Sequence, residues 1–186
     1  FVKHTYSAVT GLPFPHNTHI RILSESDYRE IHGLGSIGTY TEEIRGEQTI
    51  RFLNIKAGSS TQVITTIFHE LGHRIHKFQF DDITFKPEIK EAMAILFESI
   101  CADYFAMVEP SFANPNFLEH LHSLESRNHL IGAFLASDLI EIFGSRQQAF
   151  LFLNNFALND FEQIQGTLLR MGIPLEKLES VRITNL

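Results

Sequence analysis

The sequence predicts an α+β protein in which a small N-terminal β-sheet precedes a helical bundle. Up to Ile55, apolar and polar residues alternate with the period of two that is typical of half-buried strands. After Gly58 the apolar residues recur with the period of an amphipathic helix, and this pattern continues through the rest of the chain. Glycine and proline separate the successive helical segments. The change of period therefore places the sheet first and the helices after it.

The composition indicates one globular domain over residues 1–186. Hydrophobic residues make up 44% of the chain, and 17 phenylalanines with no tryptophan predict a phenylalanine-rich core. Within this domain we expect residues 1–110 to hold the sheet and the helices of the functional site, and residues 111–186 to form a helical subdomain.

The charge pattern excludes several classes of partner. The net charge is −7 and there is no basic tract, which argues against nucleic acid and against an anionic membrane surface. No segment is apolar over a length that could cross a bilayer, so we expect a soluble protein without membrane insertion. Because the chain begins with Phe1 and not with Met, we expect a trimmed piece of a longer chain. The sequence does not decide where the protein is located, whether it is secreted, or whether a pro-segment precedes it.

The N-terminal elements follow from turn residues and from alternation. Gly11, Pro13 and Pro15 predict an irregular arm over residues 1–18. A short strand is expected at His19–Leu23, followed by a glycine-containing connection over residues 33–38. Two further strands, at Ile37–Ile44 and Thr49–Ile55, are expected to form a hairpin.

The helices are delimited by capping residues, prolines and glycines. The first contains Thr65–Phe80 and has candidate N-caps in residues 58–61. The others are expected at Pro87–Val108, from Asn114–Pro115 onward, at Arg127–Phe143, at Ser145–Ala157 and at Asn159–Met171.

The first helix carries the motif His69-Glu70-Leu71-Gly72-His73, which has the pattern HExxH. Positions four apart lie on one face of an α-helix, so the imidazoles of His69 and His73 can converge on one metal ion. Glu70 follows the first of them and can hold and deprotonate a water on that metal. Gly72 lowers helix stability by about 1 kcal/mol relative to alanine, which indicates close packing at that turn.

The next helix offers the third ligand that a catalytic zinc needs. Glu98 lies in the apolar run from Ala92 to Val108, where a carboxylate is costly to bury without a cation. We therefore expect Glu98 to be the third ligand. Glu91, two turns earlier, is the rival, although its charged neighbours are typical of a solvated helix N-terminus. Asp103 is a further alternative, or an acceptor for the free N–H of a ligating histidine.

Other polar residues carry weaker signals. His76 partly shares the face of His73, and surface or structural roles are commoner for such a residue. Tyr104, His120, His122 and His129 are alternatives for a donor that stabilises an oxyanion. The single cysteine, Cys101, excludes an internal disulfide and fits a small buried apolar residue.

These residues resemble the zincin metallopeptidases and, within them, the gluzincins. HELGH at residues 69–73 matches the zinc-binding helix, and Glu98 matches the glutamate that supplies the third ligand. The resemblance covers residues 49–106 and implies a zincin-like fold, a Zn²⁺ cofactor and peptide or protein substrates. It also implies that Thr49–Ile55 is the edge strand along which the substrate lies. Many gluzincins have an acid four residues after the ligand glutamate, where this chain has Ala102.

The expected function is that of a zinc metalloendopeptidase, a hydrolase in which Glu70 is the general base toward a metal-activated water. The principal alternative is a catalytically inactive zincin-like domain that binds a partner. A deformylase-like amidase is a second alternative, but such enzymes place a cysteine ligand before HExxH, and Cys101 follows it. A purely structural helical protein is the third.

Overall fold

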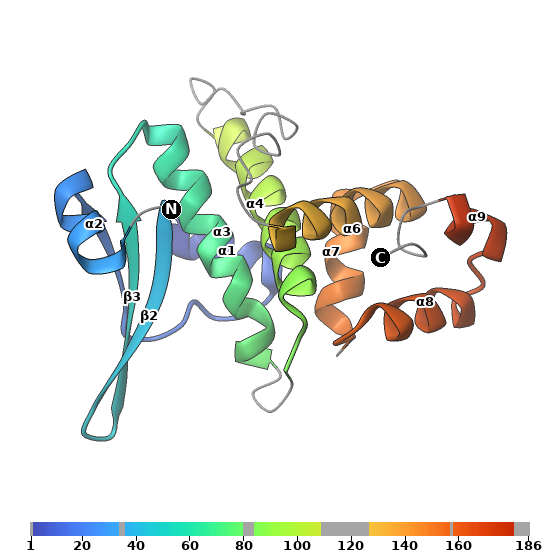
Figure 1. The fold of residues 1–186 in the computed structure, drawn as a ribbon, viewed down its shortest axis with the longest axis horizontal. Helices are drawn as coiled ribbons and strands as arrows, with labels where there is room; N and C mark the ends of the chain where they lie inside the picture. The colour runs from blue at the N-terminus through green and yellow to red at the C-terminus, as the bar shows by residue number, and fades with distance from the viewer. Residues whose placement is uncertain (1, 34–35, 80–83, 109–126, 157, 181–186) are drawn as a thin grey trace. The chain divides into compact units, whose positions relative to one another are not determined.

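The computed structural model describes residues 2–33, 36–79, 84–108, 127–156 and 158–180 (Figure 1). Over these ranges the chain forms three strands and eight helices, so the α+β prediction is confirmed. The elements in chain order are α1 (Val2–Thr10), β1 (Thr18–Leu23), α2 (Glu25–His32), β2 (Gly38–Arg45), β3 (Gln48–Lys56), α3 (Ser60–Gln79), α4 (Pro87–Val108), α6 (Arg127–Phe143), α7 (Arg146–Asn155), α8 (Phe161–Arg170) and α9 (Leu175–Ser180).

The chain divides into two compact units. One comprises residues 1–71 and 101–115, and the other comprises residues 72–100 and 116–186. Helices α3 and α4 each belong in part to both units. Residues 72–100 thus group with the C-terminal helices, and the expected boundary after residue 110 stays a prediction.

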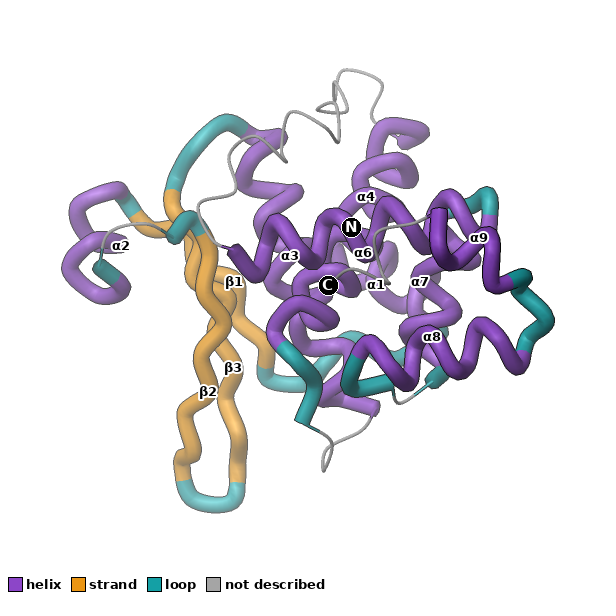
Figure 2. Tube along the Cα trace, turned by 45° about the vertical axis from the view of Figure 1, so that its right-hand side comes forward, coloured by secondary structure: helices purple, strands orange, loops and turns teal. Residues whose placement is uncertain are grey.

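The first unit contains a mixed three-stranded sheet in the order β1-β3-β2 (Figure 2). Strand β3 pairs in parallel with β1, with Ile20 opposite Leu53, and antiparallel with β2, with Tyr40 opposite Leu53. The hairpin predicted for the last two strands is confirmed. The expectation that Thr49–Ile55 is an edge strand is wrong, because β1 pairs with the other side of β3 and makes β3 the central strand.

One face of the sheet is covered by helix α3. Leu53 and Ile55 on this face are fully buried. Gly38, at the start of β2, lies against α3 so closely that a Cβ there would be 2.5 Å from Thr66 Cγ2 and 2.8 Å from Glu70 Cγ. Glycine at this position therefore lets the strand lie directly against the helix that carries the HExxH motif.

The second unit is built on the apolar helix α4. Phe97 is fully buried and packs on Phe150 of α7, with ring centroids 5.8 Å apart. Ser145 caps α7, because its side chain accepts a hydrogen bond from the backbone N–H of Gln148. Asp160 caps α8 in the same way by accepting from Gln163 N at 2.8 Å. The capping residues thus fix where these helices begin.

Several elements differ from the prediction. The arm expected over residues 1–18 contains helix α1, and the Tyr6 side chain on it is fully buried, which raises the pKa of its phenol. Helices α2 and α9 were not predicted. The helix expected from Asn114–Pro115 lies outside the described residues. The helices expected at Pro87–Val108 and Arg127–Phe143 are confirmed with those bounds.

None of the helices in the described ranges combines the length and the apolar character needed to span a bilayer.

Candidate metal centre

Helix α3 begins where the sequence places its cap. The Ser59 hydroxyl accepts a hydrogen bond from the backbone N–H of Gln62 at 3.2 Å, which satisfies one of the free donors of the first turn. Phe68, Leu71 and Ile75 are fully buried and form the apolar stripe of the helix. His69 and His73 lie beside this stripe and are half-buried. The helix therefore presents both imidazoles at the border of the core.

Close packing of α3 on α4 occurs at Gly72, as its position in the motif predicts. A Cβ at Gly72 would lie 2.5 Å from the Ala94 Cα and 3.2 Å from its carbonyl oxygen. Only a residue without a side chain permits this approach between the two helix backbones. The contact brings the residues around Ala94 beside His73, the neighbour of Gly72.

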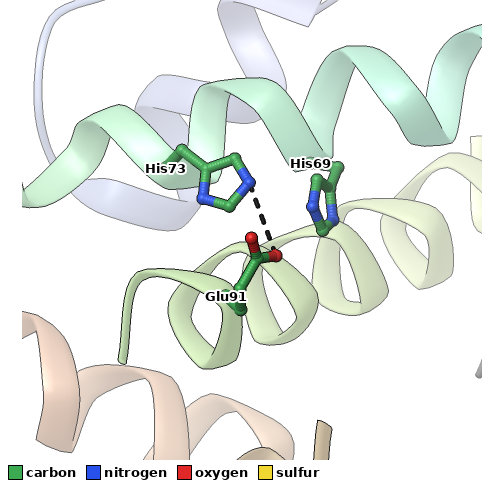
Figure 3. A group of neighbouring side chains, drawn as sticks. All are labelled: His69, His73 and Glu91. Atoms are coloured by element: carbon green, nitrogen blue, oxygen red, sulfur yellow. Dashed lines mark ion pairs between the residues drawn. The ribbon is translucent and has the colours of Figure 1, made fainter. Parts of the chain in front are cut away.

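His69, His73 and Glu91 form a group that could hold a metal ion. Each offers one ligand atom, and these atoms all lie within 4.8 Å of one another. Figure 3 shows the two imidazoles on α3 and the Glu91 carboxylate on α4 directed toward one another. His73 Nε2 is 3.6 Å from Glu91 Oε2. Two imidazole nitrogens and one carboxylate oxygen thus converge from two neighbouring helices.

The third member of this group is Glu91 and not Glu98. Glu98 lies seven residues farther along α4, which is about 10 Å along the helix axis. Glu91 does not lie at a solvated helix end, as its charged neighbours suggest, because its side chain is only 13% exposed. The structure thus brings Glu91, and not Glu98, together with the two histidines.

Helix α6 covers Glu91, and no pattern in the sequence predicts this contact. A Cβ at Gly132 would collide with the Glu91 Cβ and would lie 2.9 Å from the Ala92 backbone nitrogen. His129, one turn earlier on α6, places its Nε2 3.0 Å from Glu91 Oε2. Both residues are about forty positions after Glu91, so only the tertiary fold brings them together.

Glu70 lies on α3 directly after His69 and is half-buried. Its carboxylate is beside the first residue of β2, because a Cβ at Gly38 would be 2.9 Å from Glu70 Oε1. The residue predicted to act as general base is therefore next to one ligand histidine in the chain and next to an edge strand in space.

The geometry of the group fits a metal with nitrogen and oxygen ligands. In a tetrahedral zinc site with bonds of about 2.05 Å, two ligand atoms are about 3.4 Å apart. The distance of 3.6 Å between His73 Nε2 and Glu91 Oε2 is close to this value. Three protein ligands leave a position for water or substrate, as in catalytic zinc sites. Two histidines and one carboxylate also suit Fe²⁺, so the donor set alone does not select the metal.

Among the described residues, Asp103, Tyr104 and Cys101 are not members of the group. Asp103 and Tyr104 are half-buried on α4. Cys101 is fully buried, which confirms that it is a small core residue. His120 and His122 lie outside the described residues, as does the side chain of His76.

Comparisons with known proteins add no assignment. No protein-family model matches the chain, and neither the curated proteins nor the solved structures include a significant match to it.

Proposed function

We propose that this protein is a zinc-dependent metallopeptidase of the gluzincin type, with His69, His73 and Glu91 as the metal ligands. The observation that carries the proposal is the convergence of these three side chains within 4.8 Å, on a helix where Glu70 follows the first histidine. The resemblance of HELGH to the zincin helix supports zinc over iron, because a glutamate after the first histidine serves as the base for hydrolysis.

The reaction would be divided between the metal and Glu70. A zinc ion held by the three ligands would lower the pKa of a bound water and polarise the substrate carbonyl. The Glu70 carboxylate would accept the proton from the water as the water oxygen attacks the carbonyl carbon of the peptide. It would then donate this proton to the leaving amine, so that one carboxylate acts first as base and then as acid.

The edge strand β2 is the best candidate for holding the substrate. Lys56 N donates to Ile37 O at 2.9 Å, so Ile37 and Lys56 are a hydrogen-bonded pair of the β2–β3 ladder. Such pairs alternate along an antiparallel ladder, and the N–H and C=O groups of Tyr40 and Glu42 therefore point away from β3. Within the described part of the chain, no strand pairs with this side of β2. An extended peptide could pair there, beside Glu70.

The test is cleavage of a peptide library by the wild type, by Glu70→Gln, and by Glu30→Gln as a control on the exposed surface of α2. The wild type should cleave, should lose activity with a chelator, and should regain activity with zinc. Glu70→Gln should keep its metal and lose about 10²–10⁴-fold in kcat, the usual contribution of a general acid–base. Glu30→Gln should behave as the wild type.

Two results would contradict the proposal. Undiminished hydrolysis by Glu70→Gln would remove Glu70 from the reaction. A zinc-loaded wild type that cleaves no member of the library would favour the alternative, a zincin-like domain that binds a partner without cleaving it.

A further inference from the structure

Helix α6 brings a histidine to the candidate metal centre that lies outside the HExxH motif. His129 Nε2 is 3.0 Å from Oε2 of Glu91, the carboxylate oxygen that is also 3.6 Å from His73 Nε2. The Glu91 side chain is 13% exposed and the His129 side chain is 32% exposed, so water is partly excluded from the contact. All three residues belong to the same compact unit.

The position of His129 is fixed by the packing of α6 on α4. Gly132, one helical turn after His129, allows the two backbones to touch, because a Cβ there would meet the Glu91 Cβ and would be 2.9 Å from the Glu88 carbonyl oxygen. Ala133 and Ala136 on α6 are also buried. His129 is therefore held at Glu91 by a close backbone contact between α6 and α4, which constrains it more than a surface side chain is constrained.

The chemistry of the contact gives His129 the role of a donor. An ionised carboxylate oxygen repels the lone pair of a ring nitrogen, so at 3.0 Å Nε2 of His129 must carry the hydrogen, although the contact lacks the angle of a hydrogen bond. Each carboxylate oxygen has two lone pairs, which leaves acceptor capacity on Glu91 for a metal ion. The contact is thus an ion-pair contact, and the attraction between this N–H and the carboxylate can hold the carboxylate in one orientation.

We propose that His129 is a positioning residue that holds the Glu91 carboxylate in the orientation in which it binds the metal. The inference rests on the metal site proposed above. His129 does not belong to the group whose ligand atoms all lie within 4.8 Å of one another, and this favours a donor to the ligand over a fourth ligand. Partners of metal ligands typically contribute about 10–100-fold to metal affinity.

The experiment is a measurement of zinc affinity by competition with a chromophoric chelator. It compares the wild type with His129→Ala, His129→Gln and Leu130→Ala. The glutamine amide can place an N–H close to the position of the histidine Nε2, so His129→Gln tests whether a donor facing Glu91 is what matters. Leu130 is the next residue of α6 and is 45% exposed, which makes Leu130→Ala a control for the helix itself.

The proposal predicts that His129→Ala weakens zinc binding about 10–100-fold, as for other partners of ligands. His129→Gln should recover most of this loss, and Leu130→Ala should bind as the wild type. With Co²⁺ in place of zinc, His129→Gln should keep the wild-type absorption spectrum, because the ligands are unchanged.

The outcomes that would overturn the proposal separate it from the proposed function. Zinc binding by His129→Ala equal to that of the wild type would remove the role of His129 and leave the metal site in place. A changed Co²⁺ spectrum in His129→Gln would make His129 a ligand instead of a positioning residue. A wild type that binds no zinc would contradict the metal site itself, and with it the proposed function.

Discussion

Gly72 of α3 and Ala94 of α4 bring the two helices of the candidate metal centre into backbone contact. A Cβ at Gly72 would lie 2.5 Å from the Ala94 Cα. Because His73 follows Gly72 and Glu91 is one turn before Ala94, this contact sets the level at which the imidazole meets the carboxylate. The glycine of the HExxH motif is thus a packing residue as well as part of a sequence pattern.

Gly72→Ala should destabilise the protein although alanine is the better helix former. The gain in helix propensity is about 1 kcal/mol, whereas overpacking of a tight contact costs about 1–3 kcal/mol. Chemical denaturation should therefore show a net loss of stability. Gly166→Ala is the matched control, because a Cβ there would meet only Arg170 Nη1 at 3.5 Å, an ordinary contact. It should stabilise α8 by up to about 1 kcal/mol. Equal effects at both positions would show that the backbones do not touch at Gly72.

Glu91→Gln and Glu98→Gln should separate the two candidates for the third ligand. Glu91→Gln should weaken zinc binding by more than the roughly 100-fold that loss of a ligand's partner costs, because it removes a ligand charge. Glu98→Gln should bind zinc much more tightly than Glu91→Gln does. Isothermal titration of the purified variants measures both affinities. The reverse order would restore Glu98 as the third ligand.

The choice between Glu91 and Glu98 could not be made from the sequence. The two residues are seven positions apart and share a face of α4. Ala94, where the helices touch, is three positions after Glu91 and four before Glu98, so the spacing does not separate them. The feature that distinguishes Glu91 is its burial against Gly132 and His129, and these come from a helix about forty residues later. The convergence of His69 and His73, by contrast, could be predicted, because residues four positions apart lie on one face of a helix.

The fold was predictable where it depends on local patterns. The Gly58 boundary, the β2–β3 hairpin and the bounds of α4 follow from alternation, helical spacing and prolines. Helix α2 was missed because it is short and has one buried residue, Tyr28. The central position of β3 depends on the parallel pairing of β1 across about thirty residues, which alternation along one strand does not reveal. Long-range pairing is what the sequence pattern leaves open.

Glu42→Pro should weaken substrate binding without unfolding the sheet. The N–H of Glu42 points away from β3, so proline there removes a donor on the outer side of β2 and leaves the β2–β3 ladder intact. Loss of one hydrogen bond of about 0.5–1.5 kcal/mol should raise KM up to about tenfold. Glu42→Ala is the control, because it keeps the N–H and loses the side chain, which pairs with Arg51 and accepts from the Tyr40 hydroxyl. Similar KM values for the two variants would argue against peptide pairing on β2.

Zinc should raise the melting temperature of the protein. At a free concentration one hundred times Kd, a ligand that binds only the folded state adds about 2.7 kcal/mol of stability. For a chain of this size that corresponds to a shift of about 5–10 °C. His73→Ala should lose the shift, and a chelator should reverse it in the wild type. An equal shift in His73→Ala would place the stabilising zinc elsewhere on the chain.

The metal content of the protein purified without added chelator tests the central claim most directly. Elemental analysis should find one zinc per chain in the wild type and a clear loss in the double variant His69→Ala/His73→Ala. A wild type that holds no stoichiometric metal, even after incubation with zinc, would contradict the account. It would leave the convergence of two imidazoles and a carboxylate as a feature of helix packing alone.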